Sequence, residues 1–239
     1  MVVDLLYELS LNLMKILYLI FFIFINFSIN AFPIPKDKKA TFDILRKNKV
    51  IGNIETIFYK VDKDLIIETV VNIQIKVLFI EAYKFFQQTK EIWRNGEFIQ
   101  FEGYTDFEDE REYYIEGKDI NGKFIASGMD GKIIADKNIL PLNYWNKEIL
   151  LEDKIFDTQK GIIRNIKVKN LGKEKIEING TKILAEKYTL DASKNPKDIG
   201  PFPQYSIWYS ENGELLKFEF KNWKDKKTVT MQRSNWVNN

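Results

Sequence analysis

Carboxylates are the side chains in this sequence that are best suited to acid–base chemistry. Glu91, Glu102 and Asp157 could each act alone as an acid or a base, but a hydrolase needs two such groups facing each other across a cleft. The acidic run DFEDERE at residues 106–112 could bind Ca²⁺ or Mg²⁺ through oxygen ligands. It lacks the glycine-kinked twelve-residue pattern of a calcium loop, so we interpret it as a solvated hairpin tip. We therefore assign no catalytic residue and no metal site.

Two residue types are absent, because the sequence contains no Cys and no His. Without Cys the chain has no disulfide and no thiolate nucleophile. Without His it has no Ser-His-Asp triad and no imidazole ligand for zinc. The formal net charge is only +2, and Lys and Glu alternate along the chain, which argues against a nucleic-acid partner. We expect a protein that is not an enzyme and has no cofactor, with a carboxylate-dependent hydrolase as an alternative.

Aromatic side chains offer a different kind of chemistry, since the chain contains 18 Phe, 11 Tyr and 5 Trp. Several of these rings lie beside expected strand ends or in long connecting segments. Curved sheets that carry lipids or other apolar molecules line their concave face with such rings, although rings also fill ordinary cores. The candidate ligand-binding residues are Trp93, Tyr104, Tyr144, Trp145, Trp208 and Tyr209.

The elements that must position these rings are mostly β-strands. Residues 64–80 alternate between apolar and polar side chains, with Ile67, Val71 and Ile73 on one face, which predicts a long half-buried strand. A second β-rich run follows, and Asn95-Gly96 predicts a tight hairpin after it. Similar turn signals recur every 8 to 12 residues to the end of the chain, as in an antiparallel meander.

The fold class that follows is all-β. We expect an antiparallel meander of about a dozen strands that forms an open or half barrel or a curved sandwich, because a flat sheet of that size would expose its edges and an apolar face. Short strands with closely spaced Lys disfavour an outer-membrane barrel. One helical turn is expected near residues 146–151. The long segments 136–151 and 192–204 read as crossovers between two halves of the sheet, with lids or binding loops as the alternative.

The apolar run from Ile16 to Phe27 is interrupted only by Asn26. At roughly a dozen residues it is too short for the ~20 that a spanning helix needs, and it has the length of a signal-peptide core. We therefore expect a signal-peptide helix at residues 14–31, cleavage after Ala31, and a single β-rich domain at residues 32–239. Residues 1–13 are acidic where export favours positive charge, so we expect translation to begin at Met14 or these residues to be a prelude without function. An uncleaved anchor is the alternative.

Several short motifs stand out along the chain, namely Ile51-Gly52, Glu91-Ile92-Trp93 followed by Gly96, Pro141 with Trp145, Gly161 before a strand, and Trp208-Tyr209 with Gly213 and Leu215. Together they resemble a family of exported bacterial proteins that is known only as a domain of unknown function. The likeness covers most of residues 40–233, with Ser210 where the family pattern has Asp. It implies a periplasmic all-β domain and supplies no catalytic residue. More distantly, the organisation is similar to the half-barrels of periplasmic lipoprotein carriers.

These observations lead to two hypotheses, one for a ligand-binding protein and one for a protein–protein scaffold. The main hypothesis is a periplasmic, non-catalytic protein that holds a lipid or another apolar or amphipathic ligand on its curved sheet, in envelope maintenance, with no membrane span after processing. The alternative is an envelope scaffold whose exposed edge strand pairs with another protein.

Overall fold

The computed structural model describes residues 32–77, 80–107 and 111–236, and residues Pro33–Asn239 form one compact unit. The expected signal peptide and its cleavage site lie outside the described residues. The strands of this unit are β1 (Lys39–Arg46), β2 (Lys49–Val61), β3 (Asp64–Val77), β4 (Ile80–Arg94), β5 (Glu97–Phe107), β6 (Glu112–Ile120), β7 (Lys123–Gly128), β8 (Gly131–Asp136), β9 (Leu140–Pro141), β10 (Lys154–Asp157), β11 (Ile162–Ile178), β12 (Thr181–Ala192), β13 (Tyr205–Tyr209), β14 (Leu215–Lys221) and β15 (Thr228–Arg233).

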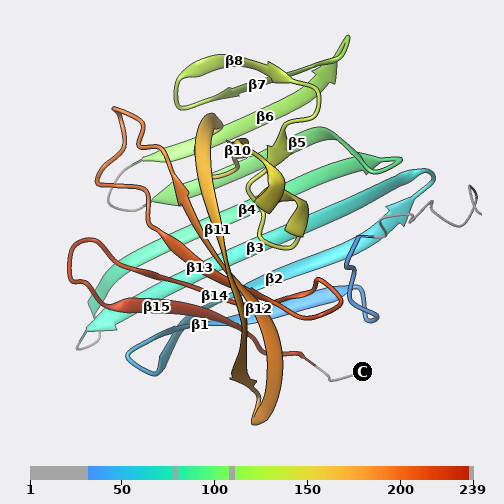
Figure 1. Cartoon of the computed structure of the whole chain (residues 1–239). Coiled ribbons are helices and arrows are strands. Elements are labelled where there is room, and N and C mark those ends of the chain that lie inside the picture. The colour runs from blue at the N-terminus through green and yellow to red at the C-terminus, as the bar shows by residue number, and fades with distance from the viewer. Residues whose placement is uncertain (1–31, 78–79, 108–110, 237–239) are drawn as a thin grey trace, which may run out of the picture. The chain divides into compact units, whose positions relative to one another are not determined.

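All fifteen strands belong to one sheet, in the order β8-β7-β6-β5-β4-β3-β2-β1-β15-β14-β13-β12-β11-β10-β9. Neighbouring strands in the described residues are antiparallel except β9 and β10, which pair in parallel. The first and last strands, β1 and β15, lie side by side at the middle of the sheet (Figure 1). In this pairing Phe42 lies opposite Arg233. The sheet does not close into a barrel, because its two outermost strands in the described residues, β8 and β9, are not hydrogen-bonded to each other. The prediction of an all-β antiparallel meander that forms an open or half barrel or a curved sandwich is therefore confirmed.

The alternation of side chains explains why β3 can form one wall of an interior. Thr69, Val71 and Ile73 of this strand point inward, whereas Asn72 between them is exposed. β3 and β4 are in register from Asp64 opposite Arg94 to Val77 opposite Ile80, with one bulge. Asn95-Gly96 joins β4 to β5 as the sequence predicts. Period-two patterning over this length fixes which face is buried, because a slip of one residue would turn the apolar side chains outward.

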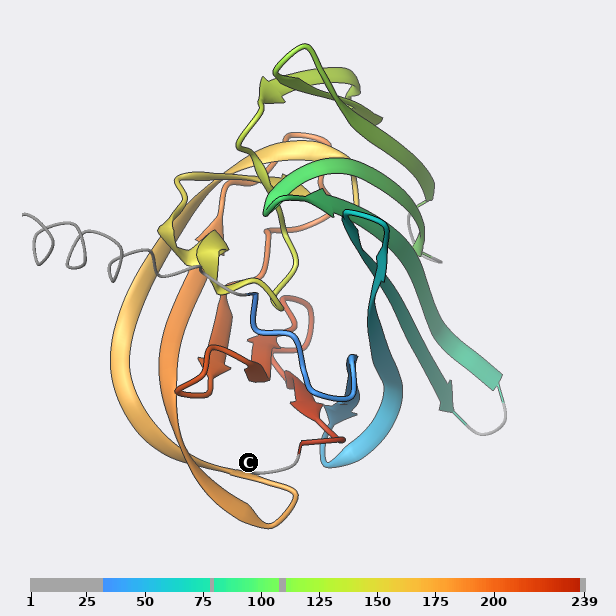
Figure 2. The same cartoon turned by 90° about the vertical axis from the view of Figure 1, so that its right-hand side faces the viewer.

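The connector between the two halves of the sheet runs from Asp136 to Lys154 and lies inside the curve of the sheet (Figure 2). It contains β9 and a single 3₁₀ turn, η1 (Lys147–Leu151), which the side chain of Asn146 caps by accepting a hydrogen bond from the Glu148 N–H. This segment is the crossover that the sequence predicts. Residues 192–204 are not one, because they join the neighbouring strands β12 and β13. That part of the prediction was wrong, since a long loop can also connect strands that pair directly.

Two glycines allow the outer strands to approach the opposite half of the sheet. The backbone N–H of Met129, in the turn between β7 and β8, donates to the Lys160 carbonyl at 2.7 Å. A Cβ on Gly128 would lie 2.3 Å from the carbonyl oxygen of Gly161, so no side chain fits there. The turn between β10 and β11 therefore contacts the β7–β8 turn without a continuous ladder of strand pairing.

The interior of the sheet is filled on one side. Phe98 of β5, Phe124 of β7 and Phe156 of β10 are buried, and the ring centroids of Phe124 lie 4.9 Å from Phe98 and 5.2 Å from Phe156. Phe101 completes this cluster at 5.3 Å from Phe156. Rings at these separations pack as in an ordinary protein core. The space between β1–β4 and β13–β15 is different, and it holds the candidate site.

Candidate functional site

A cavity of about 560 Å³ lies between the wall made by β1–β4 and the wall made by β13–β15. Its remaining sides come from three segments, namely residues 142–145 of the connector, the turn at 157–160 and residues 198–203 of the β12–β13 loop. The volume lies within the range of roughly 300–1,000 Å³ that ligand sites occupy. Exposed side chains of Ile199 and Trp223 also line it, so the cavity reaches solvent beside them.

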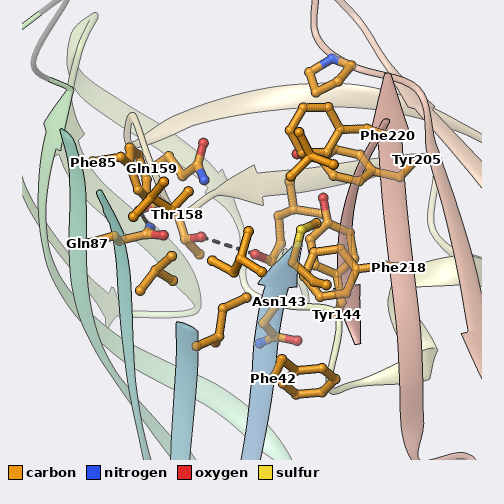
Figure 3. A pocket seen from close by; sticks show the side chains of 18 of the residues that line it. Phe42, Phe85, Gln87, Asn143, Tyr144, Thr158, Gln159, Tyr205, Phe218 and Phe220 are labelled. Carbon is orange, nitrogen blue, oxygen red and sulfur yellow. Dashed lines mark hydrogen bonds between the residues drawn. The ribbon is translucent and has the colours of Figure 1, made fainter. Parts of the chain in front are cut away.

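One wall of the cavity is aromatic (Figure 3). The ring of Phe218 on β14 lies 4.6 Å from Tyr144 and 6.1 Å from Phe42, measured between centroids. Tyr205 on β13 lies 5.0 Å from Tyr144 and 5.3 Å from Phe220. Burial raises the pKa of Tyr205 to about 12, although a hydrogen bond with Tyr144 opposes the rise. Burial also raises the pKa of Tyr144, so both hydroxyls stay protonated at physiological pH and the wall presents neutral rings with polar tips.

The opposite wall carries uncharged polar groups beside Phe85 (Figure 3). The side-chain amide of Gln87 donates to the Thr158 carbonyl at 3.2 Å, and the Thr158 hydroxyl donates to the Leu142 carbonyl at 3.0 Å. These bonds tie β4 to the 157–160 turn and to the connector. Gln159 lines the cavity beside them. A few convergent polar groups in an apolar cavity are what fix the orientation of a bound molecule.

Glu91 of β4 is a buried carboxyl group of the cavity wall, with 2% of its surface exposed. Its Oε2 accepts hydrogen bonds from Trp93 Nε1 at 2.9 Å and from Asn143 Nδ2 at 2.8 Å. Burial raises the pKa of Glu91 to about 7, because desolvation of the charged form outweighs the hydrogen bonds from Trp93, Asn143 and Trp145. This side chain changes its charge near neutral pH inside an apolar site.

A buried ion-pair network holds the loop that lines one side of the cavity. Arg164 on β11 donates to both carboxylate oxygens of Asp198, at 2.8 and 3.0 Å, and its Nε donates to Asp157 at 2.6 Å. Lys160 also pairs with Asp198 at 3.2 Å. Burial alone would raise the pKa of Asp198, but the bonds from Arg164 and the Asn195 N–H lower it to about 2. The network therefore fixes residues 195–198 to the sheet at all ordinary pH values.

Loop residue Phe202 extends this arrangement toward the aromatic wall. The Arg164 guanidinium lies 4.9 Å from the centroid of the Phe202 ring, and Phe202 lies 5.8 Å from Tyr205. The charged cluster and the apolar wall are thus directly connected. Residues 198–203 of this loop line the cavity, where a binding loop would lie. That residues 192–204 act as a binding loop or as a lid stays a prediction.

The structure places two of the six candidate ligand-binding residues on the cavity wall, namely Tyr144 and Trp145. Trp93 is buried behind them, with its ring 5.5 Å from Trp145. Tyr209 is fully buried and donates its hydroxyl to the Tyr144 carbonyl at 2.9 Å, so it supports the connector. Contact of any of these residues with a ligand stays a prediction.

The other two candidate residues lie on different surfaces. Tyr104 of β5 stacks near Tyr114, whose side chain is 71% exposed, with centroids 4.9 Å apart. Trp208 lies on the opposite face of β13 from Tyr205, where its Nε1 donates to Glu174 at 2.6 Å and it packs with Leu216. The sequence alone could have placed Trp208 and Tyr205 on opposite faces of the sheet, because side chains alternate along a strand and these two residues are three positions apart.

Of the three acids that could support hydrolysis, Glu91 and Asp157 are buried and line the cavity, and each is bound by its own partners. Glu102 is exposed on β5, where it accepts a bond from Gln100 at 2.9 Å. Asp157 is bound by Arg164, and Glu91 is bound by Trp93 and Asn143, so the two buried carboxyls have different partners. Residues 108–110 of the acidic run lie outside the described residues. Within the described residues no cluster of three acidic side chains is placed to hold a metal ion.

This chain is similar to known proteins in its sequence family and in its fold. A family model described as a domain of unknown function (DUF6134) matches residues 42–234. A search of the curated proteins found no match. A solved structure of a beta-barrel-like protein of domain of unknown function DUF1849 from Brucella abortus superposes with a TM-score of 0.55 at 12% identity, covering 82% of this chain and 94% of that one. That likeness concerns the fold.

Two further structures superpose less well. A protein of Bacteroides fragilis described as exported, with a YmcC-like fold, gives a TM-score of 0.38 at 10% identity and covers 87% of this chain and 98% of that one. A protein of Parabacteroides distasonis described as a lipoprotein gives 0.37 at 12% identity, covering 85% and 97%. In the described part of this chain, no helix has the length and apolar character needed to cross a bilayer.

Proposed function

We propose a binding function for this chain, which belongs to the family described as a domain of unknown function (DUF6134). It is a non-catalytic protein that holds an amphipathic molecule with a long apolar part. The observation that carries this proposal is the cavity of about 560 Å³ between the two walls of the sheet. An interior that was only a packed core would be filled on both sides, whereas here the rings around Phe124 fill one side alone.

The lining supports an amphipathic ligand over a purely apolar one. The rings of Phe42, Tyr144 and Phe218 offer contact surface for a chain or a ring system. Gln87, Asn143 and Glu91 offer hydrogen-bonding groups on the same cavity. These groups are already held in place by bonds within the protein, and a ligand with one polar end can bond to their remaining donor or acceptor capacity, which a hydrocarbon cannot.

The proposal places the protein outside the cytoplasm, in the periplasm, on the basis of sequence. Residues 14–31 have the charge, apolar core and small residue of an export signal, and the absence of Cys and His leaves few catalytic groups. A role in envelope maintenance agrees with a carrier of amphipathic molecules.

A second function is favoured by one edge of the sheet. β8 is hydrogen-bonded only to β7 in the described residues, and its Ile134 side chain is 64% exposed. An edge of this kind can accept a strand from another protein. Crosslinking in intact cells separates the two functions, because a scaffold yields a defined protein adduct at β8 and a carrier yields lipid adducts in the cavity.

The binding function is tested by titrating the purified, delipidated protein with a fluorescent fatty acid whose emission rises in apolar surroundings. Saturable binding with one ligand per chain is expected, together with lipid in organic extracts of the undelipidated protein analysed by mass spectrometry. Emission that rises without saturation, or extracts free of lipid combined with no titration signal, would exclude the proposal.

A further inference from the structure

The surface around the cavity opening combines positive charge with exposed apolar side chains. The turn between β1 and β2 and the turn between β14 and β15 meet there, because β1 pairs with β15 and Arg46 forms an ion pair with Asp225. The loop residues 199–203 complete the opening. We call these residues, 46–50, 199–203 and 221–227, the rim surface.

The charge of the rim surface is strongly one-sided. Residues 46–49 and 221–227 carry seven Lys or Arg side chains and one acid, Asp225, in a chain whose formal net charge is only +2. Arg46 and Lys227 both pair with that single carboxylate. The side chain of Lys227 lies close to that of Lys47, and this approach of two cations lowers the pKa of Lys47. Cations concentrated in this way attract an anionic surface.

The apolar side chains of the rim surface lie among these cations. Val50 is 62% exposed, Ile199 is 54% exposed and Trp223 is 43% exposed. Ile199 and Trp223 also line the cavity. The ammonium group of Lys224 lies 5.6 Å from the centroid of the Trp223 ring. Tryptophan beside lysine is characteristic of surfaces that lie at a membrane–water interface, where the ring enters the headgroup layer and the charge meets anionic lipid.

Trp223 also connects the rim surface to the loop that lines the cavity. A Cβ on Gly200 would lie 2.6 Å from the Trp223 ring, so the ring packs directly on the backbone of the loop at a residue with φ of +87°. Insertion of this ring into a bilayer would therefore bring the loop and the cavity opening to the lipid.

We propose that the rim surface docks on anionic membranes and presents the cavity opening to the bilayer, so that an amphipathic molecule passes between membrane and cavity. The proposal rests on the binding function proposed above and adds its partner, a lipid surface. A lipid surface is favoured over an acidic protein because the exposed Trp and Ile flank a cavity whose own proposed ligand resides in membranes. Each Lys or Arg close to an anionic bilayer raises the affinity of the protein for the membrane roughly fivefold.

The test is co-flotation of the exported, purified protein with vesicles. One vesicle is phosphatidylcholine alone and the other is an equimolar mixture with phosphatidylglycerol. The rim variant is Lys224→Glu/Lys226→Glu, and its matched control is Lys169→Glu/Lys175→Glu, which changes the charge equally at exposed positions on β11. All proteins carry the same N-terminus, so any contribution of residues 1–31 is shared by them.

The wild type and the β11 control are expected to float with the anionic vesicles, and the rim variant to bind them at least tenfold more weakly. Binding to phosphatidylcholine alone should be weak for all three. Equal loss in both variants, or no flotation of the wild type, overturns the docking proposal. The fatty-acid titration in solution should be unchanged in the rim variant. Rim-dependent flotation without any fatty-acid binding supports docking and rejects the cavity function.

Discussion

Asn143 donates its side-chain N–H to Oε2 of Glu91 across 2.8 Å, and so joins the connector between the two halves of the sheet to β4. Trp93 Nε1 donates to the same oxygen at 2.9 Å. A carboxyl group that is almost fully buried thus sits where the crossover segment meets the cavity wall. The charge of Glu91 then affects both the stability of the fold and the polarity of the site.

Replacement of Glu91 by Gln should remove a pH dependence of stability. The pKa of Glu91 in the folded chain, about 7, lies above its usual value of 4.5, so the folded state keeps a proton that the unfolded chain releases between these values. This proton contributes fully to the free energy of unfolding below pH 4.5. The contribution, roughly 3 kcal/mol, is lost as the pH rises to about 7. Urea unfolding at pH 5 and pH 8 measures this difference.

The control for this prediction is Glu102→Gln, because Glu102 is exposed on β5. It should keep the pH slope of the wild type. An unchanged slope in Glu91→Gln would contradict the assignment of the titration to this side chain.

Removal of the Asp198 charge should release the loop that lines the cavity. Asp198→Asn leaves the buried Arg164 with one acid instead of two, and breaking such a buried pair costs roughly 3 kcal/mol. Asp136→Asn breaks an exposed pair with Lys123 at 2.7 Å and should cost less than about 1 kcal/mol. Urea unfolding measures both, and limited proteolysis should cut residues 193–204 faster only in Asp198→Asn. Equal costs would mean that the network does not hold the loop.

A methyl group at Gly128 should separate the two turns that meet there. Because its Cβ would lie 2.3 Å from the Gly161 carbonyl oxygen, Gly128→Ala must move backbone and should lower the free energy of unfolding by roughly 1–3 kcal/mol. Ser127→Ala, at the neighbouring exposed position, should change it by less than about 0.5 kcal/mol. Thermal unfolding of both variants measures the difference. Equal melting temperatures would show that this contact is dispensable.

A larger side chain on the inner face of β3 should block the cavity. Val71 lines it and Val70, its neighbour, lies on the opposite face of the same strand. Val71→Trp should weaken fatty-acid binding at least about tenfold, whereas Val70→Trp should leave the affinity near that of the wild type. The titration described above measures both, with circular dichroism to confirm that each variant is folded. Equal effects of the two substitutions would place the ligand elsewhere.

Local patterns in the sequence were sufficient for the strands and turns. The alternation at residues 64–80 predicts the inward position of Val71 and Ile73, and Asn95-Gly96 predicts the hairpin that follows β4. The single helical turn near residue 146 is also confirmed. These features depend on neighbours in the chain, because side-chain period and turn residues are local properties.

The cavity could not be predicted in the same way, since its walls meet through distant pairing. Phe42 and Phe218 share a wall because β1 pairs with β15 and β15 with β14, and nothing near either residue signals that arrangement. The partnership of Arg164 with Asp198 likewise depends on a loop that returns to the sheet. Gln87 and Asn143 were missed for the same reason.

The most direct test of a ligand-binding cavity is photocrosslinking with a fatty acid that carries a diazirine on its chain, followed by peptide mapping. We expect adducts on inner-wall residues such as Val71, Tyr144 and Phe218, and their loss in Val71→Trp. Adducts confined to the outer face around Tyr104 and Trp208, or no saturable labelling at all, would contradict it.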